Sequence, residues 1–182
     1  PLLVALGAWA TVGEVLPPLA WAGIGAISGG IFLLARPSRL GHAHKGSILA
    51  AFGTALTVAA YSVADGIGVR ASQEALAYVA WLFTAEIFVA AFVLGTRHKR
   101  LRAMSGRTVI IGLAGGVISG AAYAMALYAK TIAPIGMVSA MRETSVIFAA
   151  LFGVIWFGEE PRRQRLIAAA TVCFGVILIG LS

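Results

Sequence analysis

The stretch RTVIIGLAGGVISGAAYAMALY (residues 107–128) decides the fold of this chain. After Arg107 it contains no charged residue and is rich in glycine, alanine and aliphatic side chains. At about 1.5 Å per residue, a helix of this length crosses a hydrocarbon core of roughly 30 Å. The stretch therefore predicts a transmembrane helix.

Apolar runs of similar length fill most of the remaining chain. Residues 1–13 resemble the tail of one span, and full spans are expected at residues 18–35, 47–69, 76–96, 134–157 and 164–181. The runs are continuously apolar, whereas a transmembrane β-barrel has strands of about ten residues with alternating polarity. We expect an all-α polytopic membrane protein, a bundle of about six and a half transmembrane helices, with the lipid bilayer as its surroundings.

The composition excludes soluble and disordered proteins. Of the 182 residues, 60% belong to the AVILMFWYC set and 12% are charged, whereas an average soluble domain is about 25% charged. Disorder requires low hydrophobicity and high charge. The net charge of +7 does not indicate a nucleic-acid partner, because the basic residues lie in short loops between apolar runs.

These loops carry a strong charge bias that predicts the orientation. Eleven lysines and arginines fall on one side of the membrane, and only Arg70 and Lys130 fall on the other. Positive charge accumulates in cytoplasmic loops, so the richer side is expected in the cytoplasm and the C-terminus outside. The eleven residues are Arg36, Arg39, Lys45, Arg97, Lys99, Arg100, Arg102, Arg107, Arg162, Arg163 and Arg165.

Two segments match each other at an offset of 145 residues: GEVLPPLAWAGIGAISGGIFLL (13–34) and GEEPRRQRLIAAATVCFGVILI (158–179). At this offset Gly30 aligns with Gly175 and Gly23 with Ala168. Five helices separate the two copies, an odd number, so the second is expected upside down relative to the first. Inverted repeats are typical of secondary transporters. Glu14 and Glu159 open the two segments, where a carboxylate suits the N-terminal end of a following helix.

Charged residues inside the spans are the main candidates for a functional site, because a charge in the bilayer costs about 2.5–3.5 kcal/mol on insertion scales. Arg142 is expected to attract an anionic group of a substrate, and Glu86 or Asp65 to carry a proton in each transport cycle. The alternative is that Arg142 pairs with one of these carboxylates and only locks the bundle. Glu143 points about 100° away from Arg142 on a helix. The full candidate set is Arg142, Asp65, Glu86, Tyr61, Tyr78, Trp81, Tyr123 and Ser139.

Two further patterns concern packing and ligands. Gly112, Gly116 and Gly120 have the spacing that lets two helix backbones approach closely, with a sliding surface as the alternative. The pair His42 and His44 lies in a basic loop without an acidic or cysteine neighbour, so we expect no metal site and no cofactor.

Three segments of the second half resemble the EamA domain of the drug/metabolite transporter superfamily. They are GLAGGVISGAAYAMALYAKTI (112–132), the span from Arg142 to Glu160, and RLIAAATVCFGVILIG (165–180). The helix that contains AAYSVADGIGVR (59–70) looks like the opening helix of such a domain. The resemblance implies ten helices in two five-helix repeats.

On this resemblance, residues 1–35 are the last two helices of the first repeat. Residues 36–46 form a basic loop, and residues 47–182 are the complete second repeat. The chain is then an N-terminally truncated fragment that needs the missing helices or a second copy as its partner. Relatives are described with both termini in the cytoplasm, which differs from the orientation that the charge bias predicts.

The function that the resemblance implies is secondary transport. The chain is expected to move a small-molecule substrate across the cell (inner or plasma) membrane by alternating access, in the direction of export. The alternative is a non-transporting membrane domain that completes a helical bundle with a partner or a second copy. An enzyme is not expected, because no nucleophile or metal cluster lies at the membrane interface.

Overall fold

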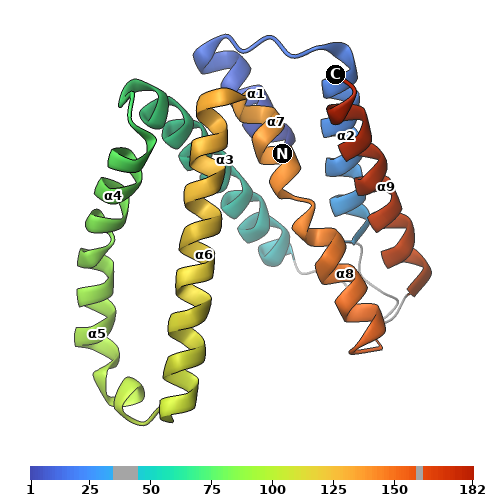
Figure 1. Ribbon diagram of the computed structural model, residues 1–182. Coiled ribbons are helices and arrows are strands. Elements are labelled where there is room, and N and C mark those ends of the chain that lie inside the picture. The colour runs from blue at the N-terminus through green and yellow to red at the C-terminus, as the bar shows by residue number, and fades with distance from the viewer. Residues whose placement is uncertain (35–44, 159–161) are drawn as a thin grey trace. The chain divides into compact units, whose positions relative to one another are not determined.

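The computed structural model describes residues 1–34, 45–158 and 162–182. Within these ranges the chain forms α-helices and no β-strand (Figure 1). The helices are α1 (Leu2–Val12), α2 (Pro18–Leu34), α3 (Lys45–Ala71), α4 (Ala75–Ala85), α5 (Ile87–Arg102), α6 (Gly106–Ile132), α7 (Ile135–Arg142), α8 (Ser145–Ile155) and α9 (Arg162–Gly180).

Five helical runs are long and apolar enough to cross a membrane. They are Gly46–Ala71, Ala75–Arg102, Gly106–Ile132, Ile135–Ile155 and Arg162–Gly180, while Leu2–Val12 and Pro18–Leu34 are shorter apolar helices. The prediction of an all-α polytopic membrane bundle is confirmed. In lipid, every backbone N–H and C=O must be satisfied within the protein, so continuous apolar runs form helices.

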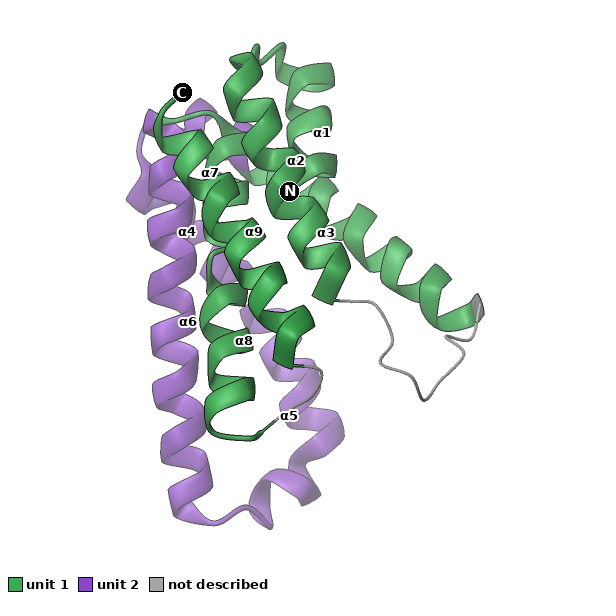
Figure 2. Ribbon diagram, turned by 90° about the vertical axis from the view of Figure 1, so that its right-hand side faces the viewer, with its two compact units in different colours: residues 1–65, 133–182 green, residues 66–132 purple. Residues whose placement is uncertain are grey.

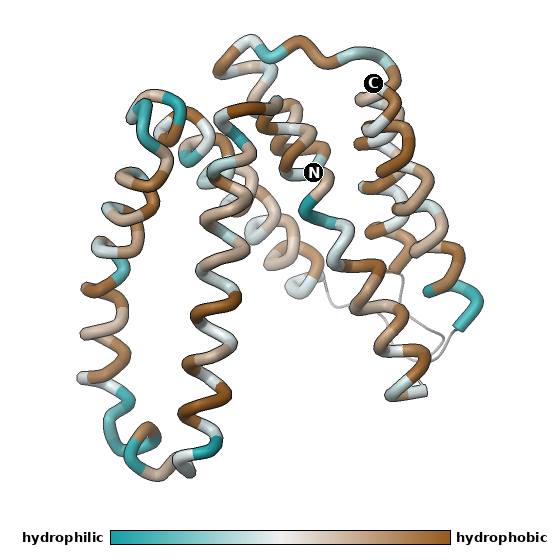
Figure 3. The backbone as a smooth tube through the Cα atoms, viewed as in Figure 1, coloured by the Kyte–Doolittle hydropathy of each residue, from teal (hydrophilic) through white to brown (hydrophobic). Residues whose placement is uncertain are grey.

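Large apolar side chains lie on the surface of these helices. Phe88 is 81% exposed, Phe92 71% and Leu113 66%. Such a surface would be unstable in water, but it matches the apolar interior of a bilayer. In Figure 3, hydrophobic residues run along the helices, and hydrophilic residues gather at the end of α5 and the start of α6. The chain is therefore a multi-pass membrane protein.

The contacts divide the chain into two compact units (Figure 2). Unit 1 consists of residues 1–65 and 133–182, and unit 2 of residues 66–132. This division follows packing, whereas the domain boundaries expected from the sequence follow the repeats and stay a prediction. The expected basic loop, residues 36–46, lies mostly outside the described residues.

The centre of unit 1 is the seam between α2 and α9, which lie side by side in Figure 1. A Cβ atom placed on Gly23 would lie 2.7 Å from the carbonyl oxygen of Gly175, and one on Gly175 would lie 2.6 Å from the carbonyl oxygen of Gly23. Only glycine permits this approach at both positions. The buried residues around the seam are Ala5, Leu16, Ala20, Ile24, Ile27, Ala140, Val172 and Ile179.

Unit 2 is held together mainly where the end of α3 meets the start of α4 and the end of α6. Val69, Val79 and Leu127 form its buried core. The guanidinium Nε of Arg70 donates a hydrogen bond of 2.7 Å to the backbone carbonyl oxygen of Lys130. Lys130 itself is buried. This bond joins the two basic residues that the charge pattern places on the same side of the membrane.

Two spans that were expected to be continuous are interrupted. The run 76–96 breaks at Glu86, between α4 and α5, and continues as helix to Arg102. Just before the break, the hydroxyl of Thr84 donates to the carbonyl oxygen of Ala80 at 2.7 Å, a contact that bends helices.

The run 134–157 breaks at Glu143 and Thr144, between α7 and α8. Here the backbone N–H groups of Glu143 and Thr144 donate to the carbonyls of Ala140 and Met141, each at 3.1 Å. These bonds reach back three residues instead of four, which is the pattern of a 3₁₀ turn.

Candidate functional site

The short helix α7 in unit 1 is the element that carries Arg142, and its start is held by a distant carboxylate. The backbone N–H of Ile135 donates to both carboxylate oxygens of Glu14, at 3.0 Å and 2.9 Å. Pro134 precedes Ile135 and has no N–H to offer. A carboxylate at this position satisfies a helix donor and suits the positive end of the helix dipole.

Packing also holds the first turn of α7 in place. Ile135 is completely buried and lies in a cluster with Val4, Ala8 and Val63. A Cβ atom placed on Gly136 would lie 2.9 Å from the Cβ atom of Ala5. The start of α7 therefore rests directly against the backbone of α1.

The other end of α7 carries the charged residues. Arg142 is its last residue and is exposed, and Glu143 follows in the turn and is half-buried. Ser139 lies one turn before Arg142 on the same helix and is half-buried. The negative end of a helix dipole favours a cation such as the guanidinium. A hydrophilic segment marks this break between α7 and α8 in Figure 3.

On α3, the polar residues Thr54, Thr57, Tyr61 and Asp65 follow each other at helical spacing as one stripe, of which one part is buried and one part exposed. Asp65 is 8% exposed and Tyr61 is 38% exposed. The hydroxyls of Thr54 and Thr57 are exposed and donate to their own helix, to the carbonyls of Ala50 at 2.9 Å and Gly53 at 3.0 Å. Among these four residues, only Asp65 is buried.

In unit 2, two of the candidate aromatic residues are half-buried against the core. Tyr78 and Tyr123 pack against the cluster of Val69, Val79 and Leu127. The ring of Tyr78 lies over Gly68, where a Cβ atom would come within 2.6 Å of it. Trp81, by contrast, is 77% exposed.

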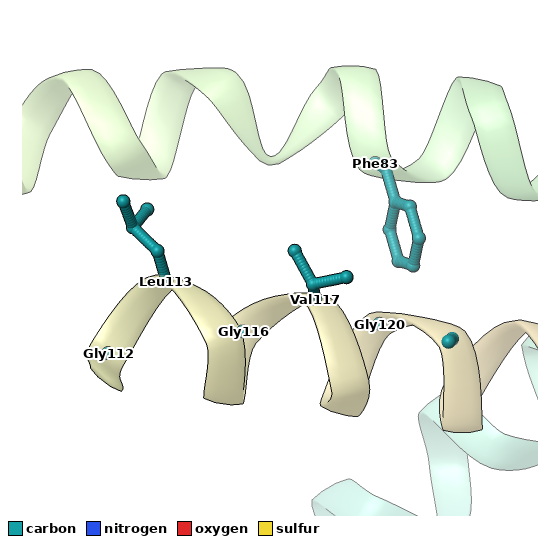
Figure 4. A pocket seen from close by; sticks show the side chains of 7 residues that line it. Phe83, Gly112, Leu113, Gly116, Val117 and Gly120 are labelled. Carbon is teal, nitrogen blue, oxygen red and sulfur yellow. The ribbon is translucent and has the colours of Figure 1, made fainter. Parts of the chain in front are cut away.

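Glu86 lies on an open groove along α4 and α5. It is exposed, and the other residues that line the groove are apolar: Phe83, Ile87, Val89, Ala90, Val93, Leu94 and Leu101. Phe83 also lines a second groove, which extends to α6 (Figure 4). Glu86 therefore places a single carboxylate on an apolar surface, at the break between two helices.

The expected packing row of α6 faces this second groove. A Cβ atom placed on Gly112 or Gly116 would meet nothing within 4 Å, and one on Gly120 would lie 3.6 Å from the ring of Phe83. In Figure 4, the side chain of Phe83 points from α4 toward α6 near Gly120. Within unit 2, close contact is limited to this one end of the row.

The candidate set is divided between the two units. Arg142, Ser139, Tyr61 and Asp65 belong to unit 1, and the other four belong to unit 2. Their roles in substrate binding and proton coupling stay predictions. His42, His44 and Glu159 lie outside the described residues.

Sequence reasoning placed Glu14 at the start of the helix that follows it. Its carboxylate instead binds the start of α7, 121 residues further along the chain. The one local signal is the preceding glycine, because Gly13 ends α1 with a positive φ of 69° and turns the chain sharply there.

A comparison with family models matches residues 45–181 to the EamA-like transporter family. The match covers most of the chain and includes α7, with Arg142. Comparisons with curated proteins and with solved structures gave no match.

Proposed function

We propose that this chain, which belongs to the EamA-like transporter family, works as a secondary transporter that moves small metabolites across the cell membrane by alternating access, in the direction of export. Members of this family are transporters and not enzymes. Direction, substrate and the identity of the membrane are parts of the proposal.

The observation that carries the proposal is the interruption of the span Ile135–Ile155 at Glu143 and Thr144, directly after Arg142. A charged residue inside an apolar span is costly and is retained where it has a function. Secondary transporters form their substrate sites from broken helices near the middle of the membrane. A guanidinium at such a break offers a fork of donors, which suits a carboxylate or phosphonate group on the substrate.

Many secondary transporters achieve alternating access with two related repeats that move against each other, and the seam of α2 and α9 supports such a relation. Gly23 lies against Gly175. The residue that corresponds to Gly23 in the second copy of the repeat is Ala168, and the residue that corresponds to Gly175 in the first copy is Gly30. These two residues are also in contact, because a Cβ atom on Gly30 would lie 3.0 Å from the carbonyl oxygen of Ala168. Contacts that exchange in this way are typical of a two-fold axis. In a membrane protein with inverted repeats, such an axis lies in the membrane plane.

The second candidate function is a non-transporting membrane domain that completes its bundle with a partner. It is favoured by the open row at Gly112 and Gly116, where no atom of the described residues fills the space beside the helix. Glycine rows of this kind accept another transmembrane helix. A second copy of the chain or the helices of a first repeat would fit.

Transport in proteoliposomes tests the proposal. The protein is reconstituted and assayed with labelled glutamate, citrate, phenylphosphonate, glucose and lysine, with and without a pH gradient. We expect movement of an anionic solute. The variant Arg142→Ala is expected to reduce its uptake at least about tenfold, a loss that corresponds to about 1.4 kcal/mol.

The matched control is Arg163→Ala, which removes the same side chain from an exposed position on α9. It is expected to leave transport unchanged. Uptake that survives in Arg142→Ala would exclude the binding role of Arg142. A folded protein that moves none of these solutes, yet forms a stable dimer in detergent, would favour the partner domain instead.

A further inference from the structure

We propose that Glu14 is a positioning residue for Arg142, acting through the short helix α7. This inference rests on the proposed function only in the role that it gives to Arg142. Three observations carry it: the hydrogen bond of Glu14 to Ile135, the close packing at Gly136, and the interruption of the α-helical hydrogen-bond pattern between α7 and α8.

The first step is that Glu14 lies on a rigid support. Gly13 closes α1 in the left-handed conformation, with its N–H donating to the carbonyl oxygen of Trp9 at 3.1 Å. The N–H of Glu14 itself points to the carbonyl oxygen of Ala8, at 3.5 Å. The carboxylate is therefore presented by the end of a helix and not by a loose connection.

The second step is that this carboxylate determines where α7 begins. Pro134, the residue before the helix, provides no side-chain hydrogen bond to cap it. The carboxylate of Glu14 supplies that acceptor from a different helix. Gly136 adds a steric restraint, because α7 can approach α1 to this distance only with a glycine at that position.

The third step is that α7 is a short helix whose orientation decides the position of Arg142. It has only 8 residues, or about 12 Å of helix at 1.5 Å per residue. After Arg142 the chain leaves the α-helical hydrogen-bond pattern before α8 begins. We therefore expect a change of angle at Ile135 to displace Arg142 more than α8, and binding sites respond strongly to displacements of about 1 Å.

A spectroscopic distance measurement tests this role without any transport substrate. In a Cys173→Ser background, spin labels are placed at Val12→Cys and Met141→Cys, both of which replace exposed residues of unit 1. Their distance distribution is measured by pulsed electron paramagnetic resonance in lipid nanodiscs. A second pair, Leu19→Cys and Ile177→Cys, reports on the seam of α2 and α9.

We expect Glu14→Ala to shift or broaden the distribution of the first pair and to leave the second pair unchanged. Glu14→Gln keeps an oxygen acceptor but loses the charge, so it should restore part of the original distribution. The control Glu74→Ala removes an exposed acidic residue that makes no cap hydrogen bond at the start of α4. It should change neither pair.

Two results would overturn the proposal. One is an unchanged first pair in a folded Glu14→Ala protein, which would leave Glu14 a merely local contact. The other is an equal change in both pairs, which would show general loosening of unit 1. Since neither result depends on solute movement, a failure of this inference is distinct from a failure of the proposed function.

Discussion

The seam between α2 and α9 makes a sharp prediction for the replacement of Gly23 by alanine. The new Cβ atom would lie 2.7 Å from the carbonyl oxygen of Gly175 and 2.7 Å from Cγ1 of Ile179. Ordinary contact begins at 3.4 Å, so the helices must separate by about 0.7 Å. A gap of this size removes about a quarter to a half of the dispersion energy of each affected atom pair.

We therefore expect Gly23→Ala to lower the free energy of unfolding by about 1–3 kcal/mol, the usual cost of overpacking a well-packed core. Gly175→Ala should cost a similar amount, because its Cβ atom would lie 2.6 Å from the carbonyl oxygen of Gly23. The double variant should cost less than the sum, since one displacement relieves both contacts.

Unfolding in mixed detergent micelles, followed by circular dichroism, measures these changes. The matched control is Gly25→Ala on the same helix, where a Cβ atom would meet nothing within 4 Å. It is expected to change stability by no more than about 0.5 kcal/mol. If Gly23→Ala were as stable as Gly25→Ala, the close approach of the two backbones would be refuted.

Three further predictions concern other residues. Gly13→Ala should destabilise the protein by about 1–2 kcal/mol in a chemical unfolding series, because its φ of 69° strains a residue with a Cβ atom; Gly13→Asn should cost less, and equal losses would contradict the reasoning. Gly68→Ala should displace the ring of Tyr78, because the Cβ atom of the alanine would lie 2.6 Å from it, and should speed proteolysis in the connection between α3 and α4. The control is Gly53→Ala on the same helix, where a Cβ atom would meet nothing within 4 Å. Glu86→Gln should abolish the dependence of transport on a pH gradient. A dependence that persists would place the proton site elsewhere, and Asp65→Asn would be the next variant to measure.

The spans were predictable because lipid leaves the chain little choice. The apolar run after Arg107 has only one low-energy conformation in a bilayer, since each N–H and C=O must be bonded within the segment. The helix α6 accordingly covers it completely, from Gly106 to Ile132. Composition and run length carry this information directly.

The breaks in the spans were not predictable in the same way. Neither Glu86 nor Arg142 adjoins a proline or glycine, the residues that usually mark such points. Thr84 bonds to its own helix just before Glu86, but Thr54 and Thr57 make the same contact within the continuous helix α3, so this contact does not identify a break. At the break after Arg142, four backbone hydrogen bonds reach back three residues instead of four, and no residue type in the sequence indicates this change.

The site was predictable as a list of residues but not as an arrangement. The presence of charge inside apolar spans identified Arg142 and Asp65 as candidates, but it could not predict that Arg142 is exposed and Asp65 buried. The partner of Glu14 is decided by tertiary packing across most of the chain. Periodicity describes one helix at a time, so it contains no information on such a contact.

The hydrogen bond between Glu14 and Ile135 also has a consequence for biosynthesis. The two residues are 121 positions apart, and a ribosome adds about 5–20 residues per second. Ile135 is therefore synthesised about 6–24 seconds after Glu14. Unit 2 is a continuous segment that can assemble during this interval, whereas unit 1 is made of the first and last parts of the chain. Unit 1 can complete its packing only after α9 has been synthesised and inserted. In a translation product that stops before α9, the face of α2 that packs against α9 would lack its partner helix.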